Sequence, residues 1–487
     1  MPKARTRDVF VLLPGIMGSV LQRNGRDAWA ISGKAMCRAL LTLGGSISEL
    51  TLGVDDPAVD DLGDGVFATR TMADAHIVPG FVRVDGYSII RQMILTEFDV
   101  VEGSFTEPTP GDVRLERAGT YFDMPYDWRR DNRVSARRLK RLIDQALAER
   151  RKSVPDAKVV LLGHSMGGLV SRYYLECLGG AKDCRALVTF GTPYRGSVKA
   201  IDYLANGFRK VTEIGMLSRM ARSFTAMYQL LPIYRGLQVG DVWQRVAETD
   251  DVPNIDRGRA EQALAFHREI ETAVSARRAT PEGASAYQLI PFVGTAQDTP
   301  LSATFAQGTV VTSSALPQWM DISHGEGDGT VPKVSAIPIE MEEAHETYIA
   351  ARHGSIQQCP QVLEDLRHRL MRLQSSTLGA VRAPGYARPI SRPELSLDVG
   401  DFFGREEAVP IVARIRGDGP APKEVVATVS AADGRAAVVT RRMDRGAGGW
   451  VTQLSGMEPG LYRVEVDTRP AGLRAPVPVS ELFEVAG

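Results

Sequence analysis

The segment Gly163-His164-Ser165-Met166-Gly167 is the part of the chain best suited to nucleophilic chemistry. It follows the apolar run Val159–Leu162 and precedes a helical pattern, the strand–turn–helix setting that makes a Gly-x-Ser-x-Gly motif informative. Glycines are needed because the chain turns sharply while the serine takes a strained backbone angle. We therefore predict that Ser165 is a nucleophile and that the backbone N–H of Met166 faces an oxyanion.

A nucleophilic serine needs a histidine base, and the base needs a carboxylate that orients it. In folds with this motif the chain order is serine, acid, histidine. Asp328, in the turn Gly327-Asp328-Gly329-Thr330-Val331-Pro332, and His353 follow Ser165 in that order. This order favours Asp328 as the acid and His353 as the base. The alternative bases and acids are His345, which stands among glutamates, His324, which precedes Asp328, and Asp321 and Asp298.

The loop Pro14-Gly15-Ile16-Met17-Gly18-Ser19 is the candidate source of a second oxyanion donor. Its glycines allow the backbone to approach a ligand closely, and it follows an early apolar run, where such a donor is found in this architecture. The donor is then the N–H of Ile16 or Met17. We also predict that Met17 contacts the substrate.

Two further motifs contain residues of functional or structural interest. Gly191-Thr192-Pro193-Tyr194 ends a predicted strand at the edge of the sheet where ligands bind in such folds, so we predict substrate contacts for Thr192 and Tyr194. Asp127 and Arg129 stand two residues apart between aromatic side chains. We interpret them as a structural ion pair that holds a loop.

These loops require a scaffold that brings them together. Short apolar runs recur along the first part of the chain at Val9–Leu13, Val159–Leu162, Ala186–Phe190, Tyr287–Val293 and Thr309–Thr312. Amphipathic helical patterns, such as residues 134–151, stand between them. This alternation is typical of a mostly parallel sheet covered by helices on both faces, and with the serine motif it predicts the α/β class and an α/β-hydrolase fold.

Changes in composition and in residue pattern divide the chain into predicted domains. Residues 1–380 form the catalytic domain, and a largely helical, methionine-rich stretch of about 198–285 predicts a helical cap inserted over the carboxyl edge of the sheet. Proline and glycine residues at 381–393 predict a linker. Short β-like runs separated by turns predict a small immunoglobulin-like β-sandwich at 394–487.

Six motifs in this order resemble those of the lecithin:cholesterol acyltransferase family, which includes lysosomal phospholipase A2 and phospholipid:diacylglycerol acyltransferases. The motifs are Pro14–Ser19, Tyr126-Asp127-Trp128-Arg129, Gly163–Gly168, Gly191-Thr192-Pro193 with Gly196-Ser197, Gly327–Pro332 and His353-Gly354. The resemblance covers roughly residues 8–370. It implies an α/β-hydrolase with a cap and lid that acts on acyl esters of lipids. It also implies a triad of Ser165, Asp328 and His353 and an oxyanion hole formed by the amides of Ile16 and Met166.

Composition excludes several other classes of function. The 487 residues have a formal net charge of −1, which gives no general attraction to nucleic acid. No stretch reaches the ~18 apolar residues of a membrane span, and the first apolar run is shorter than an export signal requires. The 4 cysteines show no metal-ligand spacing, so we expect a cytoplasmic location, no metal and no other cofactor. We expect free thiols, with a Cys177–Cys184 pair as the alternative.

These observations favour a serine hydrolase that acts on lipid acyl esters through an acyl-enzyme, as a phospholipase, a lipase or an O-acyltransferase. Two alternatives stay open: a soluble carboxylesterase, and a binding or signalling module that keeps a hydrolase fold. The expected partner is a lipid or other ester substrate. Peripheral contact with a membrane and recruitment of a protein through residues 394–487 are further hypotheses.

Overall fold

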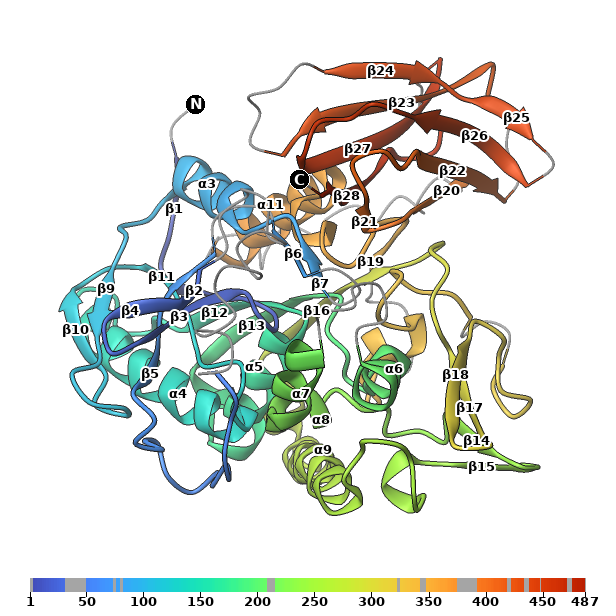
Figure 1. Cartoon of the computed structure of the whole chain (residues 1–487). Helices are drawn as coiled ribbons and strands as arrows, with labels where there is room; N and C mark the ends of the chain where they lie inside the picture. The colour runs from blue at the N-terminus through green and yellow to red at the C-terminus, as the bar shows by residue number, and fades with distance from the viewer. Residues whose placement is uncertain are drawn as a thin grey trace.

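A six-stranded parallel sheet lies at the centre of the first part of the chain in the computed structural model (Figure 1). The structure describes residues 3–30, 50–72, 76–78, 82–207, 215–321, 325–341, 347–374, 392–417, 422–432, 438–446, 448–470 and 475–486. The strand order is β11-β2-β12-β13-β16-β19, and every neighbouring pair is parallel. The strands are β2 Val9–Leu13, β11 Tyr121–Asp123, β12 Val159–His164, β13 Cys184–Phe190, β16 Gln288–Gly294 and β19 Thr347–Ile349.

Helices cover both faces of this sheet because its strands are apolar on both sides. Successive side chains of a strand point to opposite faces. In β2, Val9, Val11 and Leu13 therefore enter one core, whereas Phe10 and Leu12 enter the other. The first core includes α4 Asn132–Arg150 and α5 Met166–Cys177, and the second includes α3 Ser88–Glu97 and α11 Pro360–Gln374. This is the arrangement of an α/β-hydrolase, as predicted.

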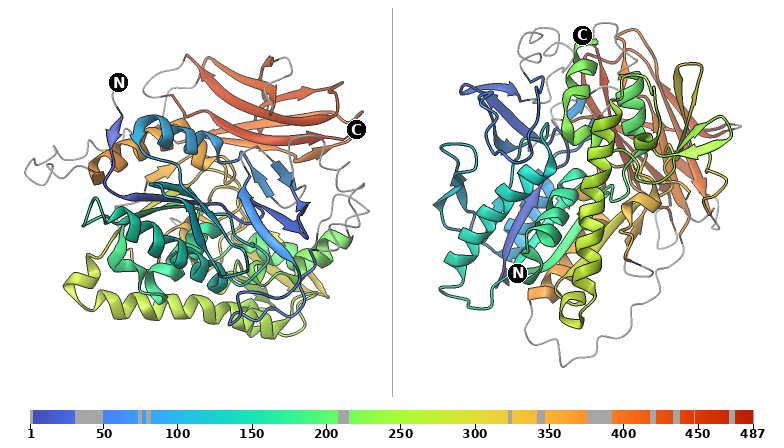
Figure 2. Two further views of the ribbon diagram at one scale, coloured as in Figure 1. Left: turned by 90° about the vertical axis from the view of Figure 1, so that its left-hand side faces the viewer. Right: turned by 90° about the horizontal axis from the view of Figure 1, so that it is seen from below.

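The segment predicted as a cap lies between β13 and β16 and contains strands as well as helices. Its elements are α6 Val198–Asn206, α7 Gly215–Ser223, α8 Thr225–Tyr228, β14 Leu237–Val239, β15 Val242–Gln244, α9 Arg257–Arg278 and α10 Pro281–Ala284. The long helix α9 runs along one side of the molecule (Figure 2). Its Phe266 and Ile270 belong to the same core as α5.

The predicted strand at Thr309–Thr312 exists, but it lies outside the central sheet. It is β18, Thr309–Ser313, which pairs antiparallel with β17, Ser302–Ala306, in a sheet of order β15-β14-β17-β18. Of its five residues only Val310 is buried. A strand that alternates between buried and exposed residues suits an antiparallel sheet with one solvated face, whereas the central parallel strands are buried on both faces.

Smaller strands flank the core. They are β1 Ala4–Arg5, β3 Ser19–Arg23, β4 Arg26–Trp29, β5 Val66–Thr71, β6 His76–Val78, β7 Val82–Val84, β8 Phe98–Asp99, β9 Ser104–Thr106 and β10 Arg114–Arg117. Cys177, Cys184 and Cys359 carry free thiols, as expected, and Cys37 lies outside the described residues. Among the described helices, none has the length and apolar character that a membrane span requires.

The last part of the chain forms two further sheets (Figure 1). Their orders are β20-β22-β26-β25 and β21-β28-β27-β23-β24. The strands are β20 Glu394–Val399, β21 Phe402–Phe403, β22 Val409–Arg416, β23 Glu424–Ala431, β24 Val439–Arg442, β25 Asp444–Gly446, β26 Gly449–Leu454, β27 Gly460–Arg469 and β28 Val479–Val485. Inward-facing residues of both sheets, such as Ile411 and Val464, share one core. We call residues 394–486 the C-terminal unit. Most of the predicted linker at 381–393 lies outside the described residues.

Candidate active site

Ser165 occupies the sharp turn between β12 and α5. Its backbone angles are φ 50° and ψ −123°, a strained conformation for a residue with a side chain. The turn leaves no room for neighbouring side chains: a Cβ on Gly163 would lie 2.8 Å from Gly168 Cα, and one on Gly167 would lie 2.5 Å from the Pro14 carbonyl oxygen. The glycines of the motif are therefore required by close approach of the backbone, as the sequence predicted.

The structure brings Ser165, His353 and Asp328 together. His353 Nε2 lies 2.9 Å from Ser165 Oγ, and His353 Nδ1 lies 2.7 Å from Asp328 Oδ2. The other carboxylate oxygen of Asp328 accepts hydrogen bonds from the amides of Thr330 and Val331 at 2.9 and 2.7 Å. A carboxylate at Nδ1 favours the tautomer with its proton there, which leaves Nε2 able to accept the serine proton.

Backbone hydrogen bonds fix the loops that carry the acid and the base. The Gln297 amide donates to the carbonyl of Gly327 at 3.0 Å, and the Gly329 amide donates to the Thr299 hydroxyl at 2.8 Å. The His353 amide donates to the Asp328 carbonyl at 2.9 Å, so the two loops are joined directly. The separation between acid and base is thus held by main-chain contacts as well as by their side chains.

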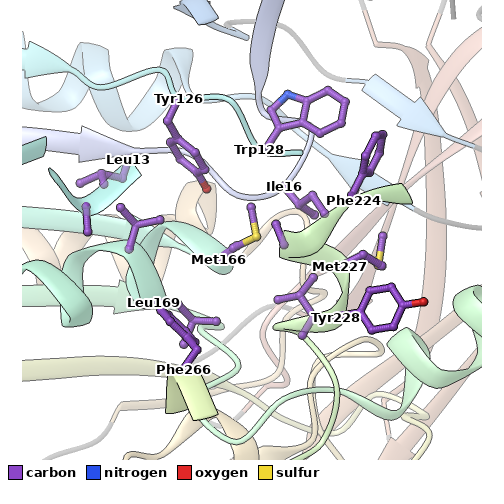
Figure 3. Close-up of a cluster of buried hydrophobic side chains, with 14 of the residues drawn as sticks. Leu13, Ile16, Tyr126, Trp128, Met166, Leu169, Phe224, Met227, Tyr228 and Phe266 are labelled. Atoms are coloured by element: carbon purple, nitrogen blue, oxygen red, sulfur yellow. The ribbon is translucent and has the colours of Figure 1, made fainter. Parts of the chain in front are cut away.

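The amides of Ile16 and Met166 are available to an oxyanion. No described residue accepts a hydrogen bond from either amide. Met166 is the first residue of α5, so its N–H lies at the positive end of that helix. The Ile16 and Met166 side chains belong to one buried hydrophobic cluster with Trp128 and Phe224, which anchors both donors (Figure 3).

The motif Tyr126-Asp127-Trp128-Arg129 supports the oxyanion loop. The Tyr126 hydroxyl donates to the Pro14 carbonyl at 2.7 Å, and Trp128 Nε1 donates to the Ser19 carbonyl at 2.9 Å. Arg129 Nη2 lies 2.7 Å from Asp127 Oδ2, which is the predicted ion pair. No sequence pattern signals the two aromatic contacts, because hydrogen bonds to a distant loop depend on the three-dimensional fold.

A cavity of about 210 Å³ opens above Ser165 and His353. Ile16, Met227 and Leu230 contribute apolar surface to its wall. Its charged lining residues are Arg83, Lys199, Arg352, Asp202, Asp328, Asp401 and Glu481. The lining of the cavity therefore combines apolar and charged side chains.

Two features of this lining could not be anticipated from the sequence. Asp401 and Glu481 belong to the C-terminal unit, so this unit forms part of the cavity wall. Lys199 Nζ lies 3.5 Å from Thr330 Oγ1. Burial, reinforced by the positive charges of Arg83 and Arg352, lowers the pKa of Lys199 to about 8.

The three residues predicted to contact substrate have other contacts. Met17, Thr192 and Tyr194 are not among the described residues that line the cavity. The Met17 carbonyl accepts a hydrogen bond from Trp29 Nε1 at 3.3 Å. The Thr192 hydroxyl donates to the Ser165 carbonyl at 2.9 Å, so it supports the nucleophile turn. The Tyr194 side chain is buried, and its hydroxyl donates to Thr189 Oγ1.

The alternative acids are exposed, and the alternative bases lie outside the described residues. Asp298 and Asp321 are exposed, whereas Asp328 is 1% exposed. His324 and His345 lie outside the described residues.

Comparisons with known proteins connect part of this chain to a family. Residues 112–290 match the sequence profile of the lecithin:cholesterol acyltransferase family, which confirms the resemblance drawn from the motifs over that range. The matched segment contains Ser165 but ends before Asp328 and His353. No curated protein sequence matches the chain.

Solved structures similar to the chain include two crystal structures of the Bacillus licheniformis lipase BlEst2. The mature form is 13% identical, covers 76% of this chain and 94% of its own chain, and gives a TM-score of 0.34. The propeptide form is 12% identical, covers 99% of this chain and 93% of its own chain, and gives a TM-score of 0.32.

Proposed function

We propose that this protein is a serine hydrolase that acts on acyl esters of lipids, with Ser165 as nucleophile, His353 as base and Asp328 as the acid that orients it. The observation that carries the proposal is the pair of contacts made by His353, 2.9 Å to Ser165 Oγ and 2.7 Å to Asp328 Oδ2. The family match over residues 112–290 supports lipid acyl esters as the substrate class.

The reaction proceeds in two half-reactions. His353 Nε2 takes the Ser165 hydroxyl proton as Oγ bonds to the ester carbonyl carbon, and the carbonyl oxygen becomes an oxyanion held by the amides of Ile16 and Met166. The carbon–oxygen bond to the alcohol then breaks, and His353 returns the proton to the leaving alcohol. Water, or a second alcohol, attacks the acyl-enzyme by the same steps in reverse and releases Ser165.

A substrate panel separates a lipid hydrolase from a soluble carboxylesterase. The panel pairs a short-chain p-nitrophenyl ester with a long-chain ester and with phosphatidylcholine vesicles, and each is also measured on Ser165→Ala. We expect Ser165-dependent release of fatty acid from the long-chain substrates. Turnover confined to the short-chain ester would reject lipid esters as the substrate class, whereas absence of turnover on every ester would reject the hydrolase itself.

We also infer that the C-terminal unit is a β-sandwich of the immunoglobulin-like class. Two edge strands of the second sheet, β21 and β24, are set aside. With the other seven strands lettered in chain order, β20-β22-β26-β25 reads A-B-E-D and β28-β27-β23 reads G-F-C. These are the strand orders of the two sheets in that class. Recruitment of a protein or membrane by this unit stays a hypothesis.

A further inference from the structure

The buried hydroxyl of Tyr87 contacts two residues, each of which directly precedes a residue of the proposed site. Tyr87 lies between β7 and α3, and its side chain is 2% exposed. Its hydroxyl oxygen accepts a hydrogen bond from the Gly15 amide at 2.8 Å and lies 2.8 Å from His164 Nδ1. Gly15 precedes Ile16, and His164 precedes Ser165. Tyr87 is therefore connected to both the oxyanion loop and the nucleophile turn.

The chemistry of the acceptors fixes the direction of these hydrogen bonds. His164 Nε2 lies 3.0 Å from the His353 carbonyl oxygen, which can only accept, so Nε2 carries a proton. In the neutral ring Nδ1 then accepts from the Tyr87 hydroxyl. Burial raises the pKa of the Tyr87 phenol above its ordinary value, so the hydroxyl keeps the proton that it donates. A continuous path runs from the Gly15 N–H through Tyr87 and His164 to the His353 carbonyl.

The backbone around Tyr87 also supports the loop of the base. The Asp85 amide donates to the Gly354 carbonyl at 2.9 Å, and Gln357 Nε2 donates to the Gly86 carbonyl at 3.1 Å. A Cβ on Gly354 would lie 1.8 Å from the Arg83 carbonyl oxygen, so the two backbones are in close contact. The segment that carries Tyr87 and the loop that carries His353 therefore form one packed unit.

Building on the proposed function, we propose that Tyr87 is a positioning residue for acyl transfer: its hydroxyl holds the oxyanion loop and, through His164, the base in register with Ser165. Tyr87 is not among the described residues that line the cavity, so it acts through its neighbours. The oxyanion donor, the nucleophile and the base must meet one tetrahedral intermediate. A displacement of about 1 Å in such an arrangement costs on the order of 100-fold in rate.

The test compares Tyr87→Phe with Tyr121→Phe. Tyr121 is also fully buried, and its hydroxyl donates to Asp123 Oδ1 at 2.8 Å on β11, away from the cavity. Each substitution removes one phenolic hydroxyl and keeps the ring; two hydrogen bonds are lost at Tyr87 and one at Tyr121. We expect Tyr87→Phe to lower kcat for a p-nitrophenyl ester about 10- to 100-fold with little change in KM, and to slow fluorophosphonate labelling of Ser165 similarly. Tyr121→Phe should keep the wild-type kcat.

The outcomes separate the proposal from its premise. A kcat for Tyr87→Phe within twofold of wild type, or an equal loss in both variants, overturns the positioning role. A wild-type protein that neither turns over the ester nor takes up the probe rejects the proposed function instead.

If Tyr87→Phe does not fold, His164→Asn is the variant that tests the positioning role. The Asn side chain can still accept from Tyr87 at the Nδ1 position but is too short to reach the His353 carbonyl. We expect the same selective loss of kcat. A wild-type kcat for His164→Asn contradicts the path to the base.

Discussion

Arg352, the residue before His353, forms an ion pair with Glu481 of the C-terminal unit, with 3.1 Å between Arg352 Nε and Glu481 Oε2. The N–H does not point along this line, so the contact is ionic rather than a hydrogen bond. The same carboxylate oxygen lies 3.1 Å from Arg83 Nη1. Burial lowers the pKa of Arg352.

A second contact reaches the loop of the acid. Gln297 donates from its side chain to the Leu395 carbonyl at 3.1 Å and accepts from the Leu397 amide at 3.2 Å, while its main-chain amide holds Gly327. The C-terminal unit is therefore in direct contact with the residues that carry both Asp328 and His353.

Glu481→Gln should reduce the free energy of unfolding by about 3 kcal/mol, because it leaves two partly buried guanidinium groups without their carboxylate. Arg416→Gln is the matched control: it also removes an ion pair between the C-terminal unit and the rest of the chain, with Glu326, but both side chains are more than a third exposed. Its cost should stay below about 1 kcal/mol. Urea unfolding measures the loss of unfolding free energy in each variant. Equal losses in the two variants would contradict the larger contribution that we assign to the Glu481 ion pairs.

Asp328→Asn should lower kcat by about 10⁴-fold while the protein stays folded. The amide can still accept from Thr330 and Val331, but its NH2 group faces His353 Nδ1 and favours the wrong tautomer of the ring. Asp298→Asn, at an exposed acid of the neighbouring loop, serves as control and should keep the wild-type rate. The prediction fails if Asp328→Asn hydrolyses a p-nitrophenyl ester at the wild-type rate.

His267 should make the protein sensitive to acid between pH 6.5 and 4. Burial lowers its pKa from 6.5 to about 4, while Nε2 donates to the Gln229 carbonyl at 2.8 Å. The unfolded chain binds a proton at His267 as the pH falls through 6.5, whereas the folded chain does not, so stability decreases on acidification, by up to about 3 kcal/mol at pH 4.

His267→Gln tests this origin, because glutamine offers an N–H donor but does not titrate. The free energy of unfolding of the variant should decrease less between pH 7 and pH 4 than that of wild type. The same decrease in both proteins would assign the acid sensitivity to other groups.

Local patterns predicted the central fold, and they selected three residues that lie side by side in the structure, Ser165, Asp328 and His353. Strands such as Val9–Leu13 are apolar throughout, which is required of parallel strands buried on both faces. The steric demands of the Ser165 turn leave a glycine pattern that is readable in the sequence, and chain order favoured Asp328 and His353 over the other candidate acids and bases. Thr309–Thr312 was assigned to the wrong sheet because a short β pattern does not specify its partner strand.

Contacts between distant segments were not predictable in the same way. Tyr87 contacts Gly15 and His164, which are 72 and 77 positions away in the sequence. Tyr87 belongs to none of the motifs found in the sequence. Glu481 lines the cavity and pairs with Arg83 and Arg352, which are more than 100 positions away in the chain. Thr192 was expected at the substrate because its loop ends a strand at the ligand edge, but its hydroxyl instead supports the nucleophile turn. The domain boundaries and the cytoplasmic location stay predictions.

The most direct test of the account is covalent labelling of Ser165. Wild-type protein and Ser165→Ala are incubated with a fluorophosphonate probe and compared by intact mass, with circular dichroism as a check that both are folded. We predict one adduct on wild type and none on Ser165→Ala. Labelling of folded Ser165→Ala to the wild-type extent would contradict the assignment of Ser165 as the nucleophile.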